Sequence, residues 1–174
     1  PSKGFVSYTT MIMGLAQNDC WYEAVEVFKD MRFAGVIPNE VTLASVMSAC
    51  AHLGGIWNCW MLHGLVIKLQ LEGLVLISTN LLHMYCLCLR VLEVRRLFEE
   101  MPERNIVSWN VMLNGYSKAG LVDMARELFE RIPSKDVVSW GTMINCYVQV
   151  EWLAEAFTVY RAMLCTGVGP NDIM

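Results

Sequence analysis

The feature that most constrains the fold of this chain is a segment of eleven residues that occurs twice. It reads IVSWNVMLNGY at residues 106–116 and VVSWGTMINCY at residues 137–147, so the second copy begins 31 residues after the first. A fixed period of this size is typical of a repeat architecture, in which each repeat is one supersecondary unit. We therefore expect an array of similar units rather than one globular domain.

Alignment on this segment divides the chain into five units of 35, 35, 31, 31 and 35 residues. These units are residues 5–39, 40–74, 75–105, 106–136 and 137–171. Residues 1–4 resemble the end of a preceding unit, and residues 172–174 resemble the start of a further one. Because no polar capping repeat is present at either end, we expect the chain to be a window cut from a longer array.

Each unit is predicted to form two helices. In the fourth unit the apolar residues after Ser108 recur at helical spacing, Gly120 ends this first helix, and Pro133 closes the second. Hydroxyl residues at the third position of four units are predicted to be N-caps, namely Ser7, Thr42, Ser108 and Ser139. A hairpin of this size cannot bury its own apolar face, so the hairpins must stack on one another.

Composition gives only weak indications of function. The net charge of −4 gives no sign of the basic patch that nucleic-acid binders usually carry. The seven cysteines lack paired spacing, and Cys86 and Cys88 lack the two-residue gap of zinc and redox motifs, so we expect a reducing compartment and no metal or cofactor.

Residues 41–67 contain no charged side chain, which is long enough to suggest a membrane span. Polar residues such as Thr42, Asn58 and His63 interrupt this segment, and Gly54 and Gly55 divide it. We therefore expect two buried helices and no contact with a membrane.

The segments VFKDMRFAGVIPNEVTLASVMSACAHLG and LFEEMPERNIVSWNVMLNGYSKAG resemble the pentatricopeptide repeat (PPR) proteins, specifically the plant PLS subclass. The resemblance implies an all-α fold, a right-handed α-solenoid of stacked helix-turn-helix hairpins. Its unit types would be P for 5–39, L for 40–74, S for 75–105, S-like for 106–136 and P for 137–171. A tetratricopeptide array is the structural alternative, but its period is a steady ~34 residues.

The resemblance implies that the chain binds single-stranded RNA and reads one base per repeat. In the family the fifth residue of the first helix and the last residue of the repeat select the base. The selector pairs would be Thr9 with Asn39, Ala44 with Leu74, Thr79 with Asn105, Asn110 with Asp136, and Gly141 with Asn171. Without the family, polar residues at such places are interpreted as caps or solvated groups.

Family rules applied to these pairs predict a site close to 5′-A-N-A-U-N-3′. Ala44 and Leu74 carry no polar group, so the second unit is expected to read no base. An apolar residue at the second position of each unit would sandwich the base: Val6, Val41, Leu76, Val107 and Val138. The alternative for these five residues is core packing. Lys118 is the one candidate for a phosphate contact at the family's usual place.

Arrays of this subclass usually direct RNA processing or cytidine-to-uridine editing in mitochondria or chloroplasts. The editing chemistry needs an H-x-E and a C-x-x-C motif, and this chain has neither, so we expect a recognition module rather than an enzyme. The L unit would be free to bind editing-helper proteins, and the isolated fragment would self-associate. The alternatives are a protein-interaction solenoid and a degenerate PPR fragment without RNA binding.

Overall fold

The computed structural model describes residues 4–169, except for the side chains of Ile56 and Trp57. Within this range the chain forms ten α-helices and no strand, which confirms the predicted all-α fold class. The predicted fragments of neighbouring units at residues 1–3 and 172–174, and the selector Asn171, lie outside the described residues.

The helices alternate between first and second members of hairpins. Their bounds are α1 Phe5–Gln17, α2 Trp21–Phe33, α3 Glu40–Leu53, α4 Ile56–Lys68, α5 Val75–Leu87, α6 Val91–Glu100, α7 Ile106–Lys118, α8 Val122–Arg131, α9 Val137–Gln149 and α10 Leu153–Cys165. The chain divides into two compact units, one of residues up to Pro102 and one from Glu103 onward.

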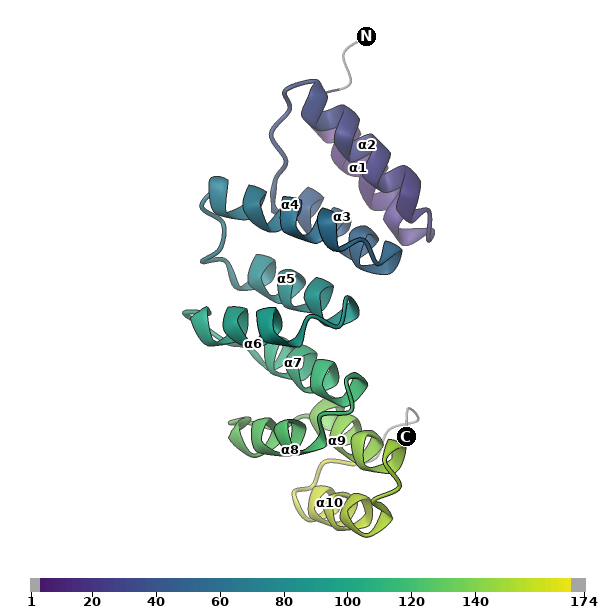
Figure 1. Ribbon diagram of the computed structural model, residues 1–174, viewed down its shortest axis with the longest axis vertical. Helices are drawn as coiled ribbons and strands as arrows, with labels where there is room; N and C mark the ends of the chain where they lie inside the picture. Colours follow the sequence, from purple (N-terminus) through teal and green to yellow (C-terminus); the bar gives the residue numbers. More distant parts are fainter. Residues whose placement is uncertain (1–3, 170–174) are drawn as a thin grey trace. The chain divides into compact units, whose positions relative to one another are not determined.

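The first compact unit contains the three hairpins α1–α2, α3–α4 and α5–α6 (Figure 1). The first helices stack side by side, because α3 packs against both α1 and α5. The second helices join successive hairpins, since α2 packs against α3 and α4 packs against α5.

The second compact unit contains the hairpins α7–α8 and α9–α10. It repeats the same plan, because α7 packs against α9, and α8 also packs against α9. In both compact units the fold is therefore an α-solenoid built of stacked helical hairpins.

The core is built from equivalent positions of successive hairpins. The residue four places into each second helix is buried in all five hairpins: Ala24, Cys59, Val94, Ala125 and Ala156. Facing first helices contribute larger buried side chains, among them Tyr85, Tyr116 and Tyr147. Burying each large apolar side chain contributes about 1.5–3 kcal/mol, so stacking rather than helix propensity holds the hairpins together.

Turns with left-handed backbone separate the two helices of each hairpin. Gly54 has a φ of 67° between α3 and α4, which confirms that the uncharged segment 41–67 forms two helices. In residues 4–169 no helix is both long and apolar enough to cross a membrane. Gly120 has a φ of 69° after α7, whereas Leu89 takes a φ of 53° at the equivalent turn after α5.

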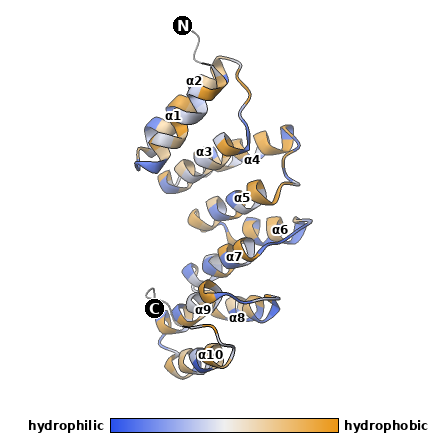
Figure 2. Ribbon diagram, turned by 180° about the vertical axis from the view of Figure 1, so that it is seen from behind, coloured by the Kyte–Doolittle hydropathy of each residue, from blue (hydrophilic) through white to orange (hydrophobic). Residues whose placement is uncertain are grey.

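Charged side chains lie mainly on the second helices of the hairpins. Lys29 pairs with Glu26 on α2, Arg96 with Glu100 on α6, and Arg126 with Asp123 on α8. The five first helices together carry only Glu40 and Lys118. Hydrophobic and hydrophilic residues alternate along the helices in Figure 2, as amphipathic packing requires.

The prediction that hydroxyl residues cap the first helices is wrong. The N-caps are Gly4, Asn39, Asn105 and Asp136, which precede Ser7, Thr42, Ser108 and Ser139 by three residues. The hydroxyl residues lie in the first helical turn, where their backbone N–H groups need an acceptor.

Candidate nucleic-acid interface

Three of the predicted selectors are helix N-caps. The side chains of Asn39, Asn105 and Asp136 accept hydrogen bonds from the backbone N–H groups of Thr42, Ser108 and Ser139, at 2.9, 2.9 and 2.8 Å. The last residue of one unit therefore starts the first helix of the next. The interpretation of these residues as caps, which the sequence left open, is confirmed.

Capping fixes how the two asparagine amides are turned. A backbone N–H can only donate, so the amide atom that faces it must be Oδ1 in both Asn39 and Asn105. The Nδ2 group of each then points away from the helix end. Both residues are exposed, so each offers hydrogen-bond donors to the solvent side.

The first selector pair is connected through a third residue. Thr9 lies on α1, and its hydroxyl oxygen is 2.9 Å from the hydroxyl oxygen of Thr42 on α3. The Thr42 hydroxyl in turn donates to Oδ1 of Asn39 at 2.7 Å. Thr9 is 9% exposed and Thr42 is fully buried, so the contact between the two hydroxyls is shielded from water, whereas Asn39 is exposed.

The fourth selector pair makes direct contact. Nδ2 of Asn110 on α7 donates to Oδ1 and Oδ2 of Asp136 at 3.0 and 3.2 Å, across 26 residues of sequence. The Ser139 hydroxyl, which is fully buried, lies 2.7 Å from Oδ1 of Asn110 and 2.8 Å from Oδ1 of Asp136. Ser139 and Asp136 also form a capping box at the start of α9.

This network keeps Asp136 ionised. Partial burial disfavours the carboxylate, but the hydrogen bonds from the Ser139 N–H and from Asn110 outweigh burial, and the pKa of Asp136 is lowered from its usual value. The pair therefore presents an amide whose Nδ2 end is turned toward a carboxylate, and that carboxylate can only accept.

The remaining predicted selectors differ in environment. Thr79 on α5 is 9% exposed, and its hydroxyl oxygen has no hydrogen-bond partner among the described residues. The hydroxyl of Ser108 donates to the carbonyl oxygen of Asn105 at 2.8 Å. Ala44 and Gly141 are half-buried and Leu74 is exposed, and none of the three carries a polar side chain.

The apolar residues at the second position of each unit lie on the surface. Val6, Val41, Leu76, Val107 and Val138 are between 43% and 71% exposed. The alternative interpretation of these residues as core is therefore wrong. Lys118, the candidate phosphate contact, is exposed in the last turn of α7.

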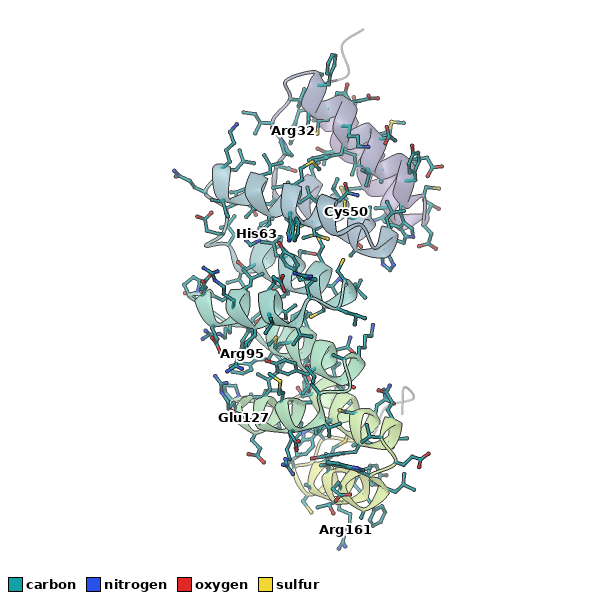
Figure 3. All side chains as sticks on the ribbon, in the orientation of Figure 1. Arg32, Cys50, His63, Arg95, Glu127 and Arg161 are labelled. Carbon is teal, nitrogen blue, oxygen red and sulfur yellow. The ribbon has the colours of Figure 1, made fainter. Side chains whose placement is uncertain are left out.

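A polar pair between α4 and α5 was not predicted from the sequence. Nδ1 of His63 is 2.9 Å from the hydroxyl oxygen of Tyr85, and Figure 3 labels His63 on α4. Burial lowers the pKa of His63 and raises the pKa of Tyr85 to about 12. The signal was present in the sequence, because His63 stands where Phe28, Phe98 and Phe129 stand in other units.

No group of three or more His, Cys, Asp or Glu side chains able to hold a metal ion is found between residues 4 and 169. The thiols of Cys59 and Cys88 lie 3.5 Å apart. The polar groups that converge at the predicted selectors are amides, hydroxyls and one carboxylate.

Hairpins that repeat the same helix pair, with caps and polar residues at equivalent places, define a helical-repeat protein. Residues 3–52 match the PPR repeat family, and residues 77–106, 107–137 and 138–168 match the PPR repeat. The chain belongs to the pentatricopeptide repeat family.

Relatives with this architecture occur in Arabidopsis thaliana. The chain is 66% identical over 146 residues to a pentatricopeptide repeat-containing protein named as mitochondrial. The aligned segment covers 84% of this chain and 21% of the relative. It is 37% identical over 120 residues to a pentatricopeptide repeat-containing protein named as chloroplastic, and this aligned segment covers 69% of this chain and 19% of the relative. The chain thus spans about a fifth of the length of each.

A solved structure shares the fold. The crystal structure of PPR10, a pentatricopeptide repeat protein, in complex with an 18-nucleotide psaJ RNA element superposes with a TM-score of 0.87 at 20% identity. The superposition covers 98% of this chain and 26% of PPR10. A structure of PPR10 from maize superposes with a TM-score of 0.73 at 21% identity.

Proposed function

We propose that this chain is a recognition module for single-stranded RNA that reads one base with each of its base-selecting repeats. The selectors are Thr9 with Asn39, Thr79 with Asn105, Asn110 with Asp136, and Gly141 with Asn171. Val6, Val41, Leu76, Val107 and Val138 sandwich the bases, and Lys118 contacts phosphate. The predicted site is 5′-A-N-A-U-N-3′, and the chain itself has no catalytic role.

The observation that carries this proposal is the fourth selector. Asn110 and Asp136 are hydrogen-bonded to each other. The exposed residues Val107 and Val138 stand at the second positions of α7 and α9, the helix that carries Asn110 and the helix that Asp136 caps. A base that stacks between two apolar side chains can meet a hydrogen-bonding edge of fixed geometry there.

The relatives support the cellular setting. PPR10 was crystallised with RNA, and the Arabidopsis relatives are named as mitochondrial or chloroplastic. We place this chain in a mitochondrion or chloroplast, within an array of the PLS subclass with P, L and S units at 5–39, 40–74, 75–105, 106–136 and 137–171. Its work there is to specify a site of RNA processing or of cytidine-to-uridine editing.

The first helices supply little charge to this interaction. Glu40 and Lys118 are their only charged side chains, so the binding of RNA should depend weakly on salt. Stacking and hydrogen bonds to base edges then provide most of the affinity.

A second role is supported by the L unit, residues 40–74. Its selector positions hold Ala44 and Leu74, and its second helix α4 exposes Trp60, Met61 and Ile67, which are 44–54% exposed. Exposed apolar side chains at helical spacing suit a protein partner. We propose that this helix binds an editing-helper protein while the other hairpins hold RNA.

A titration tests the RNA-binding proposal directly. We expect a labelled RNA that contains 5′-A-N-A-U-N-3′ to bind the chain more tightly than RNA of the same composition in shuffled order, as measured by fluorescence anisotropy. Equal affinity for the two RNAs would contradict base selection. Absence of binding to either RNA would favour the protein-interaction solenoid.

A further inference from the structure

The base-selecting unit contains a third residue besides the two selectors. Thr42 touches both members of the first pair, and Ser139 touches both members of the fourth pair. Both hydroxyl residues are fully buried and hold the third position of the hairpin that follows. The same arrangement thus occurs once in each of the two compact units.

In the first pair the direction of each proton follows from elementary chemistry. Asn39 Oδ1 already accepts from the Thr42 N–H, so it can only accept from the Thr42 hydroxyl as well. The Thr42 hydroxyl therefore donates its only proton to Oδ1 of Asn39. In the 2.9 Å contact between the two hydroxyls, Thr9 must then be the donor.

This chain of donors fixes what the first pair can offer a base. The Thr9 hydroxyl has used its proton, so it can only accept, while the Nδ2 group of Asn39 can only donate. Adenine presents an amino donor beside a ring-nitrogen acceptor, which complements an acceptor beside a donor. Guanine presents a carbonyl acceptor and a ring N–H donor in the reverse places. Without Thr42, the Thr9 hydroxyl could turn and serve either base.

In the fourth pair the fifth position of the unit, which Thr9 holds in the first pair, is occupied by the amide side chain of Asn110. Asp136 can only accept, so the end of the Asn110 amide that faces it must be Nδ2. The single proton of the Ser139 hydroxyl has two acceptors within reach, Oδ1 of Asn110 at 2.7 Å and Oδ1 of Asp136 at 2.8 Å. Because Oδ1 of Asp136 already accepts from the Ser139 N–H and from Asn110 Nδ2, we assign this proton to Oδ1 of Asn110. A free amide matches uracil in one orientation and cytosine after turning end for end. An amide that is held at both ends matches only one of these two bases in a given pose.

We propose that Thr42 and Ser139 are positioning residues for base selection. Thr42 fixes which selector atoms donate and which accept in the first pair, and Ser139 holds in place the amide that Asp136 orients in the fourth pair. Each thereby helps to separate bases that differ in the order of donor and acceptor: adenine from guanine at the first nucleotide, and uracil from cytosine at the fourth. The inference rests on the RNA-binding function proposed above. The selector is then a set of three residues contributed by two successive hairpins.

The test measures dissociation constants for RNA carrying 5′-A-N-A-U-N-3′, with the two N positions held constant, and for RNAs with the first A changed to G or the fourth U changed to C. Thr42→Val keeps the shape of the side chain and the backbone cap but removes the hydroxyl. We expect it to lower the preference for A over G about five- to ten-fold, with the preference for U over C unchanged.

Ser139→Ala should do the converse, lowering the preference for U over C and leaving the first nucleotide unaffected. The factor should be smaller than for Thr42→Val, because Asp136 still orients the Asn110 amide. The conservative variants Thr42→Ser and Ser139→Thr should keep both preferences, because each retains a hydroxyl. Thr42 and Ser139 lie in different compact units, so a folding defect in one variant leaves the other informative. Circular dichroism identifies such a defect.

The outcomes separate the inference from the proposed function. Suppose that Thr42→Val and Ser139→Ala both fold and weaken the binding of all the RNAs by the same factor. The hydroxyls then only stabilise the helix starts, and the inference fails while the proposal of RNA binding stands. If the unchanged chain binds none of the RNAs, the proposed function fails and the inference fails with it.

Discussion

At the scale of single residues, Asn110 and Asp136 carry the sharpest consequence. The double substitution Asn110→Thr and Asp136→Asn creates the combination found at Thr9 and Asn39, beside a Ser139 hydroxyl that can replace Thr42. We expect the preference at the fourth nucleotide to move from uracil to adenine. With about 1–3 kcal/mol for each base-edge contact, the relative affinity changes by about five-fold to more than a hundred-fold.

Ala44→Ser in the L unit is the control for this recoding. It adds a hydroxyl at a fifth position where Leu74 provides no polar partner, so the preference at the second nucleotide should change far less. If the recoded chain binds RNA with an unchanged preference at the fourth nucleotide, the proposal that each selector pair selects its own base is refuted. Fluorescence anisotropy with the four bases at that nucleotide measures both.

His63 gives a second prediction at this scale, on stability. Burial lowers its pKa below 6.5, and the charges of Glu100 and Glu72 only partly oppose this. Below pH 6.5 the unfolded chain binds a proton that the folded chain does not, so the free energy of unfolding falls as the pH decreases. Above that pH the imidazole is neutral in both states and contributes no pH dependence.

His63→Phe tests this pH dependence, because phenylalanine stands at the same place on α2, α6 and α8. The melting temperature of the native chain should fall more than that of the variant between roughly pH 7.5 and roughly pH 5.5. The variant also loses the hydrogen bond to Tyr85, which changes its melting temperature at every pH. Only the change of melting temperature with pH therefore reports on the titration of His63. Equal slopes would show that His63 does not titrate differently on unfolding.

At the scale of elements, the turn between α5 and α6 holds a residue that its backbone does not favour. Leu89 has a φ of 53° and is 63% exposed, so it has little packing to lose. Leu89→Gly should raise the free energy of unfolding by about 0.5–1 kcal/mol, since relief of the strained conformation exceeds the added freedom of the unfolded chain.

Gly120→Ala is the matched opposite at the turn between α7 and α8. A Cβ there would meet nothing within 4 Å, so its cost is conformational, and we expect a loss of about 1 kcal/mol. Urea unfolding followed by circular dichroism measures both variants. A destabilising Leu89→Gly would show that the leucine side chain packs in a way that its exposure does not suggest.

Comparison of elements also shows what the sequence could predict. Hairpins followed from periodic apolar residues and from Gly120, because these signals are local. The caps were misplaced because Ser108 and Ser139 are themselves good capping types, and the Asn or Asp three residues earlier was interpreted only as the end of a repeat. The burial of Thr79 and the bonds of Thr42 depend on packing between hairpins, which no local pattern encodes.

At the scale of the whole molecule, exposed apolar side chains predict self-association of the chain. Leu153, Phe157 and Leu164 follow one another at helical spacing on α10 and are 46–63% exposed. A continuous apolar strip of this kind tends to bind another copy or a partner. We expect the sedimentation coefficient of the chain to rise with concentration.

Phe157→Glu should reduce this association, because it places a charge in the middle of the strip. Thr158→Glu adds the same charge at an exposed neighbouring position and is the control. A chain that sediments as a monomer at all concentrations would contradict the prediction. Equal effects of the two variants would indicate repulsion by net charge rather than loss of an apolar contact.

The capping role of Asn39, Asn105 and Asp136 has a consequence for how such arrays change during evolution. A residue whose side chain caps a helix is restricted to the few types that accept a backbone N–H, chiefly Asn, Asp, Ser and Thr. On the function proposed above, the same residue also selects a base. Folding therefore limits the alphabet available to recognition at this position, and a new RNA target is reached most easily through the fifth residue, which caps nothing.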